Sequence, residues 1–136
     1  MDNGQSIQHQ NAVKNLALFF QNSRKYQLLG VDHPDYSQKP PVLPNNGVGD
    51  KQNKQADVYA FDPALQRYVN GEVKLGPEVS AEHSITQFKL FSNLVNTANK
   101  VPSLLVVAIP KNYQPQLVQN LNQFGINTDN IEIVNY

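Results

Sequence analysis

The stretch from Ala56 to Leu75 decides the fold, and it reads Ala-Asp-Val-Tyr-Ala-Phe-Asp-Pro-Ala-Leu-Gln-Arg-Tyr-Val-Asn-Gly-Glu-Val-Lys-Leu. Two runs rich in Val, Tyr and Phe flank a turn that contains Pro63. This pattern predicts a β-hairpin. The rest of the chain is therefore expected to be built around one antiparallel pair of strands.

The position of the turn fixes which residues of this hairpin face each other. A turn centred on residues 64–65 pairs Phe61 with Tyr68 and places Asp57 opposite Glu72. Side chains alternate between the two faces of a strand. The polar face then holds Asp57, Tyr59, Phe61, Tyr68, Asn70, Glu72 and Lys74, and the apolar face holds Val58, Ala60, Val69, Val73 and Leu75.

Two carboxylates that face each other across a ladder destabilise a hairpin. The pair Asp57 and Glu72 therefore needs a compensating cation, which is either Lys74 or a metal ion. In the first case the three residues form an ordinary surface ion cluster of little energetic value. In the second case they form a site, and the sequence leaves both interpretations open.

Asp57 followed by Glu72-Val73-Lys74 resembles the signature of the PD-(D/E)xK, or restriction-endonuclease-like, nuclease superfamily. The proline that usually precedes the first acid is absent, since Gln55-Ala56 stands there. The resemblance implies an α/β fold with a central mixed sheet, in which an antiparallel hairpin is flanked by helices in the order α-β-β-β-α-β-α-β. It covers the order of elements from residue 5 to about residue 110, and the whole chain, residues 1–136, is expected to form a single domain.

The same resemblance implies a catalytic site. Asp57, Glu72 and the Val73 carbonyl would hold Mg²⁺ or Mn²⁺, which favour such hard oxygen ligands. Lys74 would orient or help to deprotonate the attacking water and hold a phosphate oxygen. Gln87, on the helix that follows the hairpin, would hold Lys74 or the scissile phosphate.

The first predicted helix departs from the family pattern. Many members carry a glutamate there, facing the metal, whereas this chain has no glutamate between Asp2 and Asp32. His9, Asn11 and Lys14 are the polar residues of this helix that can face a site. A His or Asn on a helix is more often solvated than a ligand, so none of the three is assigned to the site.

The other elements are predicted from apolar periodicity and from capping and turn residues. In chain order they are a helix over 6–26 capped by Ser6, a strand over 26–31, a helix from Ser80, a strand over 101–109 buried on both faces, a helix over 113–124 and an edge strand over 131–134. The apolar stripes predicted for the second and third helices are Ile85, Phe88, Phe91, Leu94, Val95 and Ala98, and then Leu117, Val118, Leu121 and Phe124.

The segment over 35–55 is rich in Pro, Gly and Asn and is predicted to be a long loop. Its Lys39, Lys51 and Lys54 would touch the backbone of a nucleic acid. Asp32-His33-Pro34-Asp35, just before it, contains metal-binding residue types, but Asp and Pro favour turns. We therefore interpret it as a turn.

Composition limits the function classes. The 136 residues include no cysteine, so disulfides and thiolate metal sites are excluded, and eleven basic residues balance eleven acidic ones. No apolar run reaches membrane-spanning length and no signal-peptide pattern begins the chain, which predicts a soluble, cytoplasmic protein that does not bind membranes.

Three functions fit these observations. The first is a metal-dependent endonuclease that hydrolyses phosphodiester bonds, with DNA as the expected partner. The second is a toxin-type nuclease acting on tRNA or DNA, which would be accompanied by an immunity protein. The third is a non-catalytic binding or assembly module with a nuclease fold. A homodimer is consistent with the small size of the chain.

Overall fold

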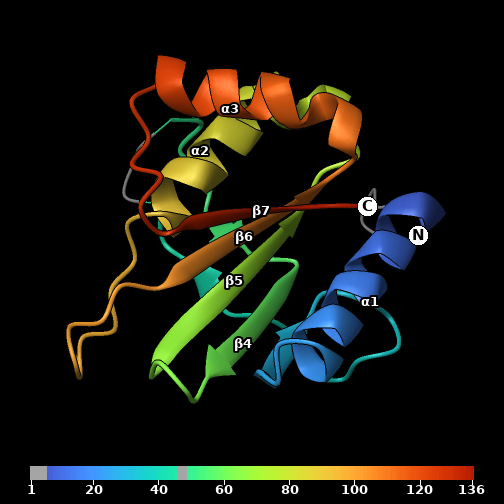
Figure 1. Ribbon diagram of the computed structural model, residues 1–136, viewed down its shortest axis with the longest axis vertical. Helices are drawn as coiled ribbons and strands as arrows, with labels where there is room; N and C mark the ends of the chain where they lie inside the picture. The colour runs from blue at the N-terminus through green and yellow to red at the C-terminus, as the bar shows by residue number, and fades with distance from the viewer. Residues whose placement is uncertain (1–5, 46–48) are drawn as a thin grey trace.

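The computed structural model describes residues 6–45 and 49–136, which form a mixed α/β fold. A five-stranded sheet has the spatial order β1-β4-β5-β6-β7, and a separate two-stranded antiparallel sheet pairs β2 with β3 (Figure 1). The strands are β1 (Gln27–Val31), β2 (Val42–Leu43), β3 (Lys54–Gln55), β4 (Val58–Asp62), β5 (Arg67–Val73), β6 (Leu104–Ile109) and β7 (Ile131–Asn135). The large sheet is mixed. The pairs β1–β4 and β4–β5 are antiparallel, whereas the pairs β5–β6 and β6–β7 are parallel.

Three helices cover the two faces of the large sheet (Figure 1). Helix α1 (Ile7–Asn22) packs on one face, and α2 (Glu82–Phe91) and α3 (Gln114–Gln123) pack on the other. Two short 3₁₀ helices, η1 (Pro77–Ser80) and η2 (Lys111–Tyr113), precede α2 and α3. None of the described helices is long and apolar enough to cross a membrane.

The register predicted for the hairpin is confirmed. Phe61 pairs with Tyr68, and the last regular pair of the ladder is Val58 with Gly71. Beyond that pair, the Asp57 N–H donates to the Gly71 carbonyl at 3.0 Å. Regular pairing thus ends one residue short of Asp57 and Glu72, so the two acids lie where the β4–β5 ladder opens.

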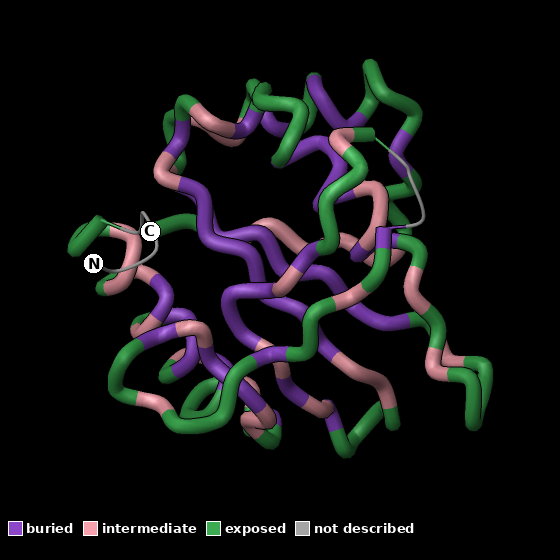
Figure 2. Tube along the Cα trace, turned by 180° about the vertical axis from the view of Figure 1, so that it is seen from behind, coloured by how far each residue is buried: buried purple, intermediate pink, exposed green. Residues whose placement is uncertain are grey.

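Strand β6 lies inside the sheet and is buried on both faces, as its uninterrupted apolar sequence predicts (Figure 2). It runs parallel to β5 and pairs Val107 with Glu72. Its residues alternate between two cores: Leu104, Val106 and Ala108 join the α1 side, and Leu105, Val107 and Ile109 join the α2–α3 side.

The start of the first helix and the position of the last strand also agree with their predictions, although α1 ends at Asn22 and not near Tyr26. The Ser6 hydroxyl caps α1 by accepting a hydrogen bond from the His9 N–H at 3.0 Å. Strand β7 is the edge strand next to β6. Arg24, just after α1, donates two hydrogen bonds to the Glu132 carboxylate on β7, at 2.8 and 2.5 Å.

The second helix is shorter than predicted and starts later. Ser80 belongs to η1 and does not cap α2, whose N-cap is Ala81. The helix ends at Phe91 because the next two side chains, Ser92 and Asn93, donate hydrogen bonds to the Lys89 carbonyl. Leu94, Val95 and Ala98 therefore lie beyond the helix and are not part of its apolar stripe.

Two further predictions are corrected by the structure. Val118 and Phe124 are 40% and 43% exposed, so only Leu117 and Leu121 of the stripe predicted for α3 are buried. The segment over 35–55 is not a loop throughout, because its Val42 and Leu43 pair with Gln55 and Lys54. Residues 46–48 of that segment lie outside the described residues.

The interior position of β6 predicts how substitutions in this strand change the free energy of unfolding. Leu105 is fully buried, so Leu105→Ala should lower the free energy of unfolding by about 2–5 kcal/mol, through lost apolar burial and the cavity left behind. Leu65→Ala is the matched control, since Leu65 is 58% exposed in the hairpin turn and its loss should cost less than about 0.5 kcal/mol. Denaturant unfolding measures both, and equal costs would contradict the interior position.

Candidate functional site

A cavity of about 310 Å³ lies where the β4–β5 ladder opens. All four residues predicted from the sequence to be catalytic line it, and so does Val73. The lining residues come from α1, α2, β3, β5 and the segments beside them, and they are His9, Asp32, Asn53, Lys54, Gln55, Asp57, Glu72, Val73, Lys74, His83 and Gln87.

Glu72 is the acid at the bottom of this site. It lies on β5, its residue is 1% exposed, and its Oε1 atom has no hydrogen-bond partner within the described part of the chain. Burial raises the pKa of Glu72 well above its ordinary value, and the negative charge of Asp57 raises it further, while Lys74 opposes the rise. The carboxyl group is thus held in an environment that disfavours its negative charge.

Asp57 is fixed by backbone hydrogen bonds on two sides. Its Oδ2 accepts from the Val73 N–H at 2.7 Å, and its carbonyl accepts from the Asp32 N–H at 2.8 Å. The same Oδ2 lies 3.6 Å from Nε2 of His9 on α1. The Asp57 carboxylate therefore lies between the end of β5 and the first helix.

Lys74 is held by contacts at both ends. Its Nζ donates to Oε1 of Gln87 at 2.5 Å and lies 3.9 Å from Oε2 of Glu72. Its carbonyl accepts a hydrogen bond from the Tyr136 hydroxyl at 2.6 Å. The expectation that Gln87, on α2, lies next to Lys74 is confirmed in position, and this contact fixes the ammonium near Glu72.

His9, which the sequence indicates as able to face a site but does not assign to one, lines the cavity. It faces the site from the first turn of α1, and the nearby Asp57 carboxylate raises its pKa although burial opposes this. Its Nδ1 is buried and has no partner among the described residues. The signal was its spacing: positions 9, 13, 16 and 20 recur at helical intervals, and the last three form the buried stripe of α1.

Lys54 does not have the exposed position expected of a lysine that touches nucleic acid. Its side chain is fully buried, and its Nζ contacts Asp50 Oδ2 at 2.5 Å and His83 Nδ1 at 2.8 Å. Burial and the positive charges of Lys54 and Lys74 lower the pKa of His83. Lys39 is also engaged, because its Nζ donates to the carbonyls of His33 and Tyr36.

The segment Asp32-His33-Pro34-Asp35 forms a turn, as interpreted from the sequence. His33 is buried and its Nδ1 accepts a hydrogen bond from the Asp35 N–H at 3.0 Å. Asp32 lines the cavity. Across residues 6–45 and 49–136, no group of three or more His, Asp or Glu side chains is clustered as in a preformed metal site.

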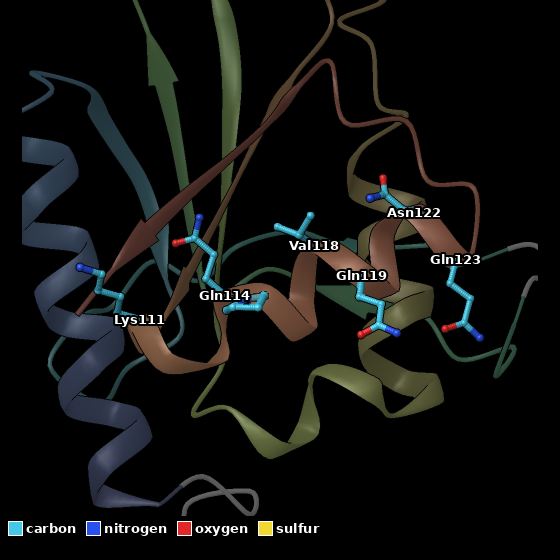
Figure 3. A pocket seen from close by; sticks show the side chains of 7 residues that line it. Lys111, Gln114, Val118, Gln119, Asn122 and Gln123 are labelled. Carbon is cyan, nitrogen blue, oxygen red and sulfur yellow. The ribbon is translucent and has the colours of Figure 1, made fainter.

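A wider hollow, of about 1100 Å³, lies on the outer side of α3 (Figure 3). Amide side chains dominate its lining, with Lys111 as the charged residue among those described, and the others are Gln114, Pro115, Val118, Gln119, Asn122 and Gln123. It contains neither of the two acids. The residues predicted to be catalytic thus line the smaller cavity and not the larger hollow.

Comparison with known proteins gives no relative: no protein-family model, no curated protein and no solved structure matches this chain. Functional inference therefore depends on the geometry of the site itself.

The burial of Glu72 predicts how stability depends on pH. Its raised pKa means that the folded protein binds a proton more tightly than the unfolded chain, so in EDTA stability should fall as pH rises from about 4.5 through the folded pKa. Glu72→Gln should remove this dependence and raise the free energy of unfolding near neutral pH by about 1 kcal/mol. Thermal unfolding followed across pH measures the effect.

Glu132→Gln is the matched control, because Arg24 lowers the pKa of Glu132 and that substitution should destabilise the protein at neutral pH. Loss of stability in Glu72→Gln as well would indicate an ordinary ion pair with Lys74 and contradict the prediction.

Proposed function

We propose that this protein is a metal-dependent nuclease with the PD-(D/E)xK fold, which hydrolyses phosphodiester bonds. The observation that carries the proposal is the convergence of Asp57, Glu72, Lys74 and Gln87 on one cavity. The order of the main elements supports it, since an antiparallel hairpin is followed by a helix and a buried parallel strand.

The donor atoms in the cavity fit a divalent cation. Glu72 supplies a buried oxygen without a partner in the described chain, and Asp57 and the carbonyl of Val73, two further lining residues, would supply the other oxygens. Such oxygen ligands suit Mg²⁺ or Mn²⁺. His9 adds an imidazole beside Asp57, where the family pattern places a glutamate. When bound, the cation would act as a Lewis acid and lower the pKa of a coordinated water.

The chain's own side chains would supply positioning. Lys74 offers an ammonium group whose location is fixed by Gln87, so it can orient the attacking water or hold a non-bridging phosphate oxygen. Gln87 acts through Lys74 and is therefore a positioning residue. Water adds to phosphorus, and the bond to the leaving oxygen breaks as that oxygen takes up a proton.

DNA is the first substrate to test, and a toxin-type nuclease acting on tRNA or DNA remains the alternative within the same chemistry. Association with a second copy, or with an immunity protein, stays a prediction.

One observation favours a second candidate, a non-catalytic binding or assembly module. Each acid already lies near a cationic or ionisable side chain: Asp57 is 3.6 Å from His9, and Glu72 is 3.9 Å from Lys74. A site neutralised from within needs no metal ion. The two functions therefore differ in metal binding and in turnover.

Activity is the first test. Plasmid DNA, single-stranded DNA and tRNA should be cut by the purified protein in Mg²⁺ or Mn²⁺ and not in EDTA. Asp57→Ala, Glu72→Ala and Lys74→Ala should each lower the rate by at least about a hundredfold, since each removes a metal ligand or the group that positions the water. Gel electrophoresis of the products measures cleavage.

Asp35→Asn is the control for these variants, because Asp35 forms an exposed pair with Lys14 away from the cavity and should keep full activity. Absence of cleavage with every substrate and metal would favour the binding module.

Metal binding can be tested without turnover. Mg²⁺ and Mn²⁺ should raise the thermal midpoint of the wild-type protein and of Lys74→Ala, but not of Asp57→Ala or Glu72→Ala. His9→Ala should weaken Mn²⁺ binding more than Mg²⁺ binding, because imidazole suits the transition metal better. Calorimetric titration measures the affinities. Equal losses for the two metals would exclude His9 as a ligand.

A further inference from the structure

A second hollow, of about 320 Å³, lies on the sheet face that carries Glu72. We call it the aromatic hollow, because two tyrosine rings form its floor. Its lining residues are Pro41, Leu43, Tyr59, Tyr68, Asn70, Leu94, Val95, Asn96, Thr97 and Ser103. None of these described lining residues carries a charge, so the hollow suits an uncharged group.

The floor of the aromatic hollow is a preformed stack. The rings of Tyr59 and Tyr68 are nearly parallel, at an interplanar angle of 5° and a centroid distance of 5.5 Å. Phe61 supports Tyr68 edge-on at 5.2 Å. All three rings are only partly buried. Flat rings presented in this way are the usual platform for planar ligands, including nucleic-acid bases.

Asn70 supplies a polar group directly beside this platform. It pairs with Tyr59 across the β4–β5 ladder and lines the aromatic hollow. Its residue is only 3% exposed, so the amide is held at the wall of the hollow. Because an amide both donates and accepts, Asn70 is suited to the edge of a base.

The aromatic hollow adjoins the candidate catalytic cavity. Asn70 and Glu72 lie two residues apart on the same face of β5, which separates them by roughly 7 Å. The two-stranded sheet also connects the aromatic hollow with the catalytic cavity. Leu43 of β2 lines the hollow, and its partner Lys54 of β3 lines the cavity. A nucleic-acid strand whose phosphate lies at Glu72 therefore has a neighbouring base within reach of Asn70.

We infer that the aromatic hollow binds an unpaired nucleobase next to the phosphate that is cut, with Tyr59 and Tyr68 stacking on the base and Asn70 contacting its edge. The inference rests on the proposed nuclease function and deepens it, because it selects single-stranded or locally unpaired nucleic acid as the substrate. A base paired within a duplex keeps both its faces stacked and cannot enter the hollow.

Binding in EDTA tests this inference without turnover. The chain contains no tryptophan and six tyrosines, so tyrosine emission can report stacking directly. A single-stranded oligonucleotide should quench this emission and bind more tightly than the same sequence as a duplex. Tyr68→Leu and Asn70→Leu should each weaken single-strand binding by about five- to a hundredfold.

Phe124→Leu is the matched control, since Phe124 is an exposed aromatic residue just after α3 and does not line the aromatic hollow. Oligonucleotides with abasic positions test the same point on the unaltered protein, so a variant that fails to fold does not weaken the experiment. One abasic position should reduce both affinity and quenching.

The outcomes separate this inference from the proposed function. Cleavage by the wild type, together with equal binding of intact and abasic strands, would overturn the aromatic hollow as a base site and leave the nuclease proposal standing. A protein that neither binds nor cuts nucleic acid in any metal would overturn both.

Discussion

The placement of a carboxylate inside the sheet is the constraint around which this structure is arranged. Strand β5 carries Glu72 on one face and Val73 on the other, and Val73 is part of the apolar core under α1. Because Glu72 pairs with Val107 of the interior strand β6 and is almost fully buried, its carboxyl group is held away from solvent. Its desolvation has to be offset by neighbours: Lys74 along the same strand and Gln87, which holds that lysine from α2.

The polar shell of the site comes from both faces of the sheet. His9 approaches Asp57 from α1, while Gln87 and His83 approach from α2. This shell lies where the ladder between β4 and β5 opens. Burying polar and charged side chains at this point is unfavourable for stability, and this is consistent with a functional site. Functional residues are often placed where another residue would make the protein more stable.

Local sequence predicted those parts of the fold that local forces control. The turn around residues 64–65 set the hairpin register, and the apolar run of β6 set its interior position. Strand alternation predicted that Glu72 and Lys74 lie on the same face, so this part of the candidate site could be predicted from the sequence. The place of His9 beside Asp57 and the burial of Lys54 were not predicted, because both depend on contacts between distant segments, namely α1 with Asp57 and the segment around Asp50 with α2.

The Arg24–Glu132 contact joins residues 108 positions apart, and it closes the structure from the first helix to the last strand. Strands β5, β6 and β7 are also parallel to one another. Two of these strands can pair only after the crossover segment that connects them has been synthesised. A topology dominated by such distant contacts folds slowly compared with a helical bundle of equal size. During synthesis, β5 remains an open edge until β6 has left the ribosome, and the buried acid of the site is enclosed only after that step.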